Sequence, residues 1–166
     1  PVFLISTLAM HTQNLLTEEQ QRTLVAEPSY WVEARLITPK GPPLARRRTV
    51  HPRDLRPYPL VNSPYAYPSS NIRVVLDQHQ VGLANYFVRA DYTASIRRFV
   101  ELGCGIGLIY AVPSMTTPSK LHERSMSRYF NDVLIHVLRR QGSFQTAPAE
   151  SFIQFVRQEL GKPRRT

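Results

Sequence analysis

The stretch VELGCGIGLIYAV, Val100 to Val112, places three glycines at alternate positions just before an apolar segment. Alternating glycines are typical of loops that hold phosphates, so the stretch first suggests a nucleotide site. A dinucleotide site needs the order strand, glycine loop, helix, because the helix N-terminus faces the pyrophosphate. Here the expected helix precedes the glycines and the expected strand follows them. We therefore interpret the glycines as a helix cap at Gly103 followed by a closely packed strand.

No other pattern predicts catalysis. Cys104 is the only cysteine, and neither His122 nor His136 stands in a signature typical of a catalytic pair. His79, His122 and His136 are too scattered along the chain for the usual spacing of metal ligands. A single cysteine also excludes an internal disulfide and fits a reducing compartment. We expect no enzyme activity, no metal site and no cofactor.

The composition indicates a folded and strongly basic protein. The 166 residues are 42% hydrophobic, enough for one compact domain or two small lobes. The net charge is +9, and 18 Arg stand against 3 Lys. Because the planar guanidinium group can grip phosphate with two hydrogen bonds, this bias favours a polyanionic partner; a basic solvated surface without a partner is the alternative. No apolar run approaches the roughly 18 residues that span a bilayer, so we expect no membrane partner.

The first 70 residues fall into three parts. Residues 1–27 have helix-compatible composition and are expected to be largely helical, and Ser29–Ile37 has the β-branched and aromatic character of a strand. Residues 39–70 hold eight of the fourteen prolines. Proline restricts the backbone and removes a donor, so we expect an extended arm or insertion there. The same segment carries Arg46, Arg47, Arg48, Arg53 and Arg56.

Regular structure is expected again from Asn71. We expect strands over 71–76, 85–90, 106–112 and 132–138, and a helix that begins at Thr93 or Ser95. A polar loop is expected over 115–130. Residues 147–160 predict an amphipathic helix whose apolar stripe comprises Phe152, Phe155, Val156 and Leu160.

The sequence therefore predicts an α/β (α+β) protein of two small lobes. An N-terminal helix and strand lobe would cover 1–38, and the proline- and arginine-rich arm 39–70. A C-terminal, mainly β lobe with one helix would cover 71–138. A helical extension over 139–166 would follow it.

Three segments of the second half form an ordered set: GLANYFVRAD (Gly82–Asp91), GCGIGLIYA (Gly103–Ala111) and a segment that ends in DVLIHV (132–137). In this order and spacing they resemble the C-terminal lobe of the universal small-subunit ribosomal protein eight family. The matching positions are Gly82, Leu83, Phe87, Arg89, Gly103, Gly105, Ile106, Leu108, Ile109, Asp132, Val133, Leu134 and Val137.

The resemblance implies a ribosomal RNA-binding lobe. The family presents a hydroxyl-rich turn to RNA after the glycine strand, whereas this chain has Tyr110, Ala111, Val112, Pro113 and Ser114 there. Hydroxyl and basic groups close by could substitute for that turn. With the five arginines of the arm, the implied RNA-binding residues are Arg89, Tyr110, Ser114, Thr116, Thr117 and Lys120.

The arm, the terminal helix and the arginine bias suggest a divergent member from a mitochondrial ribosome. The expected function is then a structural one in translation: binding small-subunit rRNA, by resemblance in its central domain, and supporting assembly. Its partners would be that rRNA and neighbouring ribosomal proteins, with no small-molecule substrate. The alternative is a basic protein–protein scaffold of another mitochondrial assembly that does not contact RNA.

Overall fold

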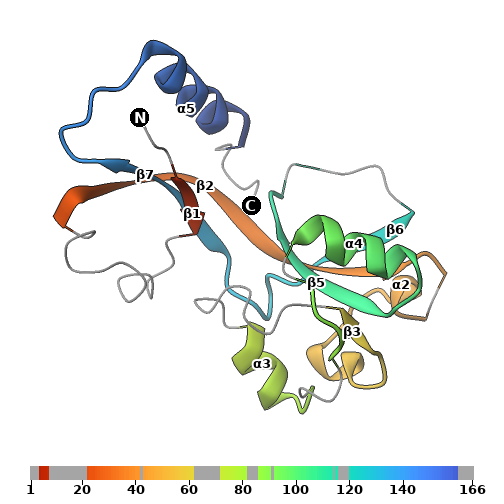
Figure 1. The fold of residues 1–166 in the computed structure, drawn as a ribbon. Coiled ribbons are helices and arrows are strands. Elements are labelled where there is room, and N and C mark those ends of the chain that lie inside the picture. The colour runs from red at the N-terminus through yellow and green to blue at the C-terminus, as the bar shows by residue number, and fades with distance from the viewer. Residues whose placement is uncertain are drawn as a thin grey trace. The chain divides into compact units, whose positions relative to one another are not determined.

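The computed structural model describes residues 4–7, 22–41, 43–61, 72–81, 86–90, 92–113, 115 and 120–160. The chain divides into two compact units. Unit 1 comprises residues 1–32, 112–115 and 132–166, and unit 2 comprises residues 33–111 and 116–131. Figure 1 shows that both are built from strands and helices, so the prediction of a mixed α/β fold is confirmed at this level.

Unit 1 is a small antiparallel sheet with one long helix. Strand β1 (Leu4–Thr7) pairs with β7 (Val133–Arg140), and β7 pairs on its other side with the first half of β2 (Leu24–Pro39). Residues Val133, Ile135 and Val137 alternate along β7 and are buried, as expected for a strand with one covered face. Helix α5 (Ala147–Leu160) follows β7 and buries Ile153 and Val156.

Unit 2 is built on the second half of β2. That half pairs with β6 (Leu121–Ser125) on one side and with β5 (Ile106–Ala111) on the other. Beyond β5 lie β3 (Leu60–Val61) and β4 (Tyr86–Val88), both parallel to their neighbours. The sheet order is therefore β6-β2-β5-β3-β4.

Helix α4 (Thr93–Glu101) covers one face of this sheet. Its Ile96 and Val100 pack with Ile37 of β2 and Ile109 of β5 in one buried cluster. Successive side chains of a strand point to opposite faces, so Leu36 and Leu108 are buried on the other face. The unit also holds α2 (Pro43–Arg46), the 3-10 helix η2 (Pro52–Leu55) and α3 (Ile72–Gln78).

The glycine stretch has the structural role expected from the sequence. Gly103 adopts φ +80° directly after α4, and its backbone N–H donates to the carbonyl of Val100. Gly107 lies where α4 approaches the sheet, because an added Cβ would stand 2.7 Å from Ile96 Cγ2. Cys104 is half-buried against the core cluster of unit 2. The helix cap and the close packing explain the pattern.

Several expected elements differ from the observed ones. Residues 4–7 and 24–27 are strands, not helix, because β7 supplies a pairing partner that overrides weak helix propensity; residues 8–21 of that expected helix lie outside the described residues. Residues 72–78 form a helix where a strand was expected, and 121–125 form a strand where a loop was expected.

The proline- and arginine-rich segment, expected to be an extended arm, packs onto unit 2 wherever it is described. It contains α2, η2 and β3. Five of its aliphatic residues are at most 3% exposed: Leu44, Val50, Leu55, Leu60 and Val61. Proline excludes regular ladders but is compatible with short helical turns, and the aliphatic residues between the prolines supply the buried contacts.

Candidate functional site

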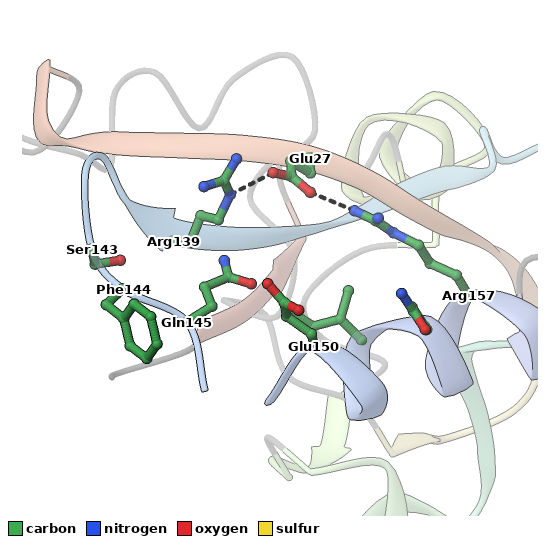
Figure 2. A pocket seen from close by; sticks show the side chains of 9 residues that line it. Glu27, Arg139, Ser143, Phe144, Gln145, Glu150 and Arg157 are labelled. Carbon is green, nitrogen blue, oxygen red and sulfur yellow. Dashed lines mark hydrogen bonds and ion pairs between the residues drawn. The ribbon is translucent and has the colours of Figure 1, made fainter. Parts of the chain in front are cut away.

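Unit 1 contains an open polar hollow of about 540 Å³. Figure 2 shows that its wall comes from β2, β7, the turn after β7 and helix α5. Most of the lining side chains can form hydrogen bonds; two are cationic and two are anionic. The lining residues are Glu27, Arg139, Ser143, Phe144, Gln145, Glu150, Ile153, Gln154 and Arg157.

Glu27 organises the charges of this hollow. Its Oε1 accepts a hydrogen bond from Arg139 Nε at 2.5 Å, and its Oε2 accepts one from Arg157 at 2.6 Å. The bond from Arg157, followed by that from Arg139, lowers the pKa of Glu27 below its ordinary value, so the carboxylate stays ionised. One carboxylate is thus shared between two guanidinium groups, and Glu150 also lines the hollow, so the wall holds two cations and two anions.

The hollow can accept an anion. Arg157 Nε is buried and has no hydrogen-bond partner within the described part of the chain. A small carboxylate or phosphate could take N–H groups of Arg139 and Arg157, which are strong donors to such groups. Ser143, Gln145 and Gln154 add neutral hydrogen-bonding groups around them.

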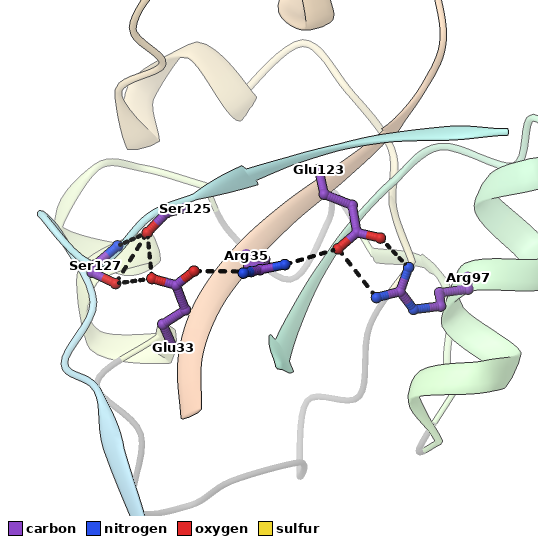
Figure 3. A network of polar contacts seen from close by, with 6 residues as sticks. All are labelled: Glu33, Arg35, Arg97, Glu123, Ser125 and Ser127. Carbon is purple, nitrogen blue, oxygen red and sulfur yellow. Dashed lines mark hydrogen bonds and ion pairs between the residues drawn. The ribbon is translucent and has the colours of Figure 1, made fainter. Parts of the chain in front are cut away.

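A second polar cluster lies inside unit 2 and is mutually neutralised. Figure 3 shows Arg35 of β2 between two glutamates: its Nε lies 2.9 Å from Glu33 Oε1 and its NH1 lies 3.5 Å from Glu123 Oε2. Arg97 of α4 also donates to both carboxylate oxygens of Glu123. Ser125 and Ser127 donate to Glu33 Oε2 at 2.8 and 3.0 Å.

This cluster joins β2, β6 and α4 instead of offering a free site. Burial alone raises the pKa of Glu33, but hydrogen bonds from Ser125, Arg35 and Ser127 outweigh that effect and lower it overall. The hydrogen bond from Arg97 is the main cause that lowers the pKa of Glu123. Both carboxylates therefore remain charged and paired, which makes the cluster a structural element of unit 2.

The five arginines predicted to bind RNA are all exposed on unit 2. Arg47 forms an ion pair of 2.9 Å with Asp54 of η2, and Arg56 Nε donates to the carbonyl of His79 at 2.7 Å. Arg46, Arg48 and Arg53 make no side-chain ion pair to any described residue. The structure therefore gathers these side chains around α2 and η2.

The other predicted RNA-binding residues that the structure describes differ in their exposure to solvent. Arg89 and Lys120 are exposed, but Tyr110 is 7% exposed and its hydroxyl donates to the carbonyl of Asn131 at 3.2 Å. Ser114, Thr116 and Thr117 lie outside the described residues. Tyr110 thus serves the interior of unit 2.

Sequence reasoning missed Glu27, Arg139 and Arg157. They stand on three elements far apart in the sequence, and no local motif marks them. Glu27 falls in the segment that the sequence predicts to be helical, so the sequence carried no signal that would bring it to Arg139 and Arg157. Over the described ranges, no group of three or more metal-ligating side chains forms, and no helix there is long and apolar enough to cross a membrane.

The comparisons with known proteins point to one family. The family described as LysR substrate binding domain matches residues 12–161. No curated protein is similar enough to the chain to count as a match.

Solved structures are similar in fold. The cofactor-binding domain of the Cbl transcriptional regulator has a TM-score of 0.65 at 20% identity, over 83% of this chain and 61% of that one. HinK, a LysR family transcriptional regulator from Pseudomonas aeruginosa, has a TM-score of 0.65 at 22% identity, over 95% and 52%. The effector-binding domain of QuiR in complex with shikimate has a TM-score of 0.58 at 13% identity, over 88% and 69%. The chain spans between half and two thirds of the length of the Cbl and HinK structures.

These findings overturn the ribosomal interpretation. The resemblance to the ribosomal protein eight family is wrong, since the LysR domain accounts for nearly the whole chain. The same match contradicts the structural role in a mitochondrial small subunit and the scaffold alternative. It also contradicts the rRNA and ribosomal-protein partners. The mitochondrial location and the exclusion of a small-molecule ligand are contradicted as well. The physical reason is that a helix cap followed by a glycine-bearing strand is needed wherever a helix packs closely on a sheet, so that pattern is not specific to one family.

The prediction that the chain is not an enzyme is confirmed, because the matching family supplies domains of transcriptional regulators.

Proposed function

The chain belongs to the LysR substrate-binding domain family, and on that premise we propose that it binds a small-molecule effector for a transcriptional regulator. The observation that carries the proposal is the extent of the family match, residues 12–161 of 166. The two compact units support the finer part of the fold prediction, a domain of two small lobes, which remains part of the proposal.

The proposed effector is a small anion. The chain has a net charge of +9. In the hollow of unit 1, two arginines share the carboxylate of Glu27, and Arg157 Nε has no hydrogen-bond partner among the described residues. The QuiR domain, which has a similar fold, binds shikimate in its solved structure. A carboxylate or phosphate group is the chemistry that such guanidinium groups recognise best.

The hollow of unit 1 is the proposed place of binding. Arg139 and Arg157 would hold the anionic group, with Gln145 and Gln154 as neutral donors to the rest of the ligand. Glu27 would keep both guanidinium groups in position before the ligand arrives, since it already binds each of them. Such preorganisation lowers the entropic cost of binding.

Thermal unfolding of the intact protein with shikimate, other small carboxylates and inorganic phosphate tests the proposal. A ligand present at about 100 times its dissociation constant should raise the free energy of unfolding by about 2.7 kcal/mol. Loss of a charge-assisted hydrogen bond in Arg139→Ala or Arg157→Ala should weaken binding by about tenfold or more. Arg140→Ala is the matched control, because Arg140 is the next residue of β7 and is not in the wall of the hollow.

The possible outcomes test the effector-binding function and the location of its site separately. If a small anion stabilises the protein and only the two wall variants bind it more weakly, both parts of the proposal hold. If all three variants bind it as tightly as the wild type, the effector function stands and the hollow is not its site. If none of these anions stabilises the protein, the proposal of a small anionic effector is contradicted.

A further inference from the structure

The positive charge of the chain is concentrated in one unit. Unit 2 contains 14 Lys and Arg against 6 Asp and Glu, a formal charge of +8. Unit 1 contains 7 against 6, a formal charge of +1. The excess therefore belongs almost wholly to unit 2, although the proposed effector site lies in unit 1.

Several acidic groups of unit 2 are already paired. Glu33 and Glu123 have side chains only 8% and 14% exposed and are bound by Arg35 and Arg97. Asp54 is bound by Arg47 and by the backbone N–H of His51, and Glu101 by Arg98. These contacts occupy four of the six acidic side chains of unit 2.

Five exposed arginines of unit 2 lie on what we call the arginine surface: Arg46, Arg48, Arg53, Arg56 and Arg128. Several contacts hold their segments together. Arg47 joins the end of α2 to Asp54 of η2. The rings of His79 and Tyr129 each lie 4.8 Å from the ring of His51, centre to centre. Arg56 binds the carbonyl of His79, and Arg128 is the chain neighbour of Tyr129.

The backbone that carries this surface is anchored. The guanidinium group of Arg124 in β6 donates to the carbonyls of Arg47 and Arg48. Pro52 and Leu55 of η2 are buried, which fixes Arg53 between them on the solvent side. Among the described residues, the side chains of Arg46, Arg48, Arg53 and Arg128 make no ion pair, so their guanidinium groups are available on a fixed frame.

We propose that the arginine surface of unit 2 binds the phosphate backbone of duplex DNA. The inference rests on the proposed function in one respect: duplex DNA is the polyanion on which a transcriptional regulator acts. Guanidinium groups bind phosphate oxygens with two hydrogen bonds and release counterions as they do so. Such contacts position a protein on DNA without reading its sequence, so no base-specific side chain is needed.

The pKa of His51 reflects desolvation and the positive charge on the arginine surface. Desolvation and then the charge of Arg53 lower its pKa, with Arg128 contributing in the same direction. His79 also lowers the pKa of His51 and Asp54 raises it. The lowered pKa favours the uncharged form of His51 near neutral pH.

Binding of the intact protein to a fluorescent duplex of arbitrary sequence, measured over a range of salt concentrations, tests the inference. The variant is Arg46→Ala, Arg48→Ala and Arg53→Ala together. The control is Arg22→Ala, Arg98→Ala and Arg140→Ala together, which removes the same charge from exposed positions elsewhere. Each lost phosphate contact lowers the slope of log affinity against log salt by about 0.9, so the variant slope should fall by about 2 to 3. Affinity at low salt should fall by about tenfold or more, and the control should bind as the wild type does.

Equal slopes and affinities for the two triple variants would overturn the inference. If the variant binds duplex normally but loses binding to poly-glutamate, the surface serves an acidic protein and the DNA assignment is wrong. Effector binding is measured on the same variants. If no effector binds but the two triple variants differ in DNA binding as expected, only the proposed function is contradicted. If an effector binds but the two triple variants bind DNA equally, only the arginine surface is contradicted.

Discussion

Gly105 and Gly107 differ from the other described glycines in what surrounds them. An added Cβ on Gly105 would stand 2.2 Å from the carbonyl oxygen of Pro59, and the residue has φ +144°. At Gly107 the nearest atoms are side-chain carbons of Ile96 and Ile37 at 2.7 and 3.0 Å. Both positions need glycine because a backbone or a helix approaches there.

Gly105→Ala should therefore destabilise the protein strongly, and Gly142→Ala only mildly. Both residues have positive φ, but nothing lies within 4 Å of a Cβ at Gly142. Backbone strain alone costs about 1 kcal/mol, whereas the clash with Pro59 adds about 1 to 3 kcal/mol more. Urea unfolding of both variants measures the difference. Equal losses of stability would show that the contact with Pro59 is unimportant.

Glu123→Gln should lower the free energy of unfolding by about 3 kcal/mol, because it leaves Arg35 and Arg97 partly buried without their shared carboxylate. Glu101→Gln is the control. Its pair with Arg98 is 3.2 Å long and Arg98 is 69% exposed, so the loss should stay below about 1 kcal/mol. Denaturant unfolding of both variants checks the ranking. A Glu123 variant as stable as the control would mean that the cluster adds nothing to unit 2.

The same carboxylates predict the response to acid. The pKa values of Glu33 and Glu123 are lowered below 4.5 in the folded protein. Their contribution to stability is therefore complete above about pH 4.5 and is lost as the pH falls through the folded pKa values. The wild type should lose stability steeply below pH 4.5, and Glu123→Gln should lose less over the same range. Urea midpoints measured from pH 7 to pH 3 test this, and parallel curves would contradict it.

Helix α5 is present as the sequence indicates, but its buried stripe is displaced. The expected stripe comprised Phe152, Phe155, Val156 and Leu160. The buried residues are Ile153 and Val156, while Phe152 and Phe155 are 53% and 60% exposed. On the same helix, Arg157 pairs with Glu27 of β2.

Ile153→Ala should thus cost more than Phe155→Ala, the reverse of what the original stripe implies. Removing the buried Ile153 side chain should lower the free energy of unfolding by about 2 to 5 kcal/mol. Truncating Phe155, which is mostly exposed, should cost less than about 1 kcal/mol. Thermal or urea unfolding of the two variants measures both losses of stability. A larger loss for Phe155→Ala would show that the aromatic face is covered in the intact protein.

Helix α3 and strand β6 also differ from the sequence prediction, the first because of the spacing of its apolar residues and the second because of its strand pairing. Ile72, Val75 and Leu76 repeat at the helical spacing, and that spacing prevailed over the β-branched composition of the segment. In β6 the residues are mostly polar, so no apolar alternation marks the strand. Pairing with β2 and the bonds to Glu123 and Ser125 stabilise it instead.

For the whole molecule, the charge distribution predicts how stability depends on salt. A net charge of +9, held mostly by unit 2, is self-repelling, and added salt screens exposed charges more than buried pairs. Stability should rise by about 1 kcal/mol when sodium chloride is raised from about 0.05 to 0.5 M. Urea midpoints at the two concentrations measure this. The triple variant of the arginine surface should gain less, and a wild type that salt destabilises would contradict the expectation.

The sequence by itself indicated a basic, non-enzymatic chain of mixed α and β structure. It also placed α4, β5, β7 and α5 and the cap at Gly103, because these features depend on patterns within about ten neighbouring residues. It did not reveal the family, since the glycine pattern is common to many sheets with a close helix. Only the tertiary structure could bring Glu27 to Arg139 and Arg157, which lie 112 and 130 positions away, or bury Glu123 between two arginines. Contacts at that separation depend on which strands pair, and pairing is a property of the folded chain that no local pattern encodes.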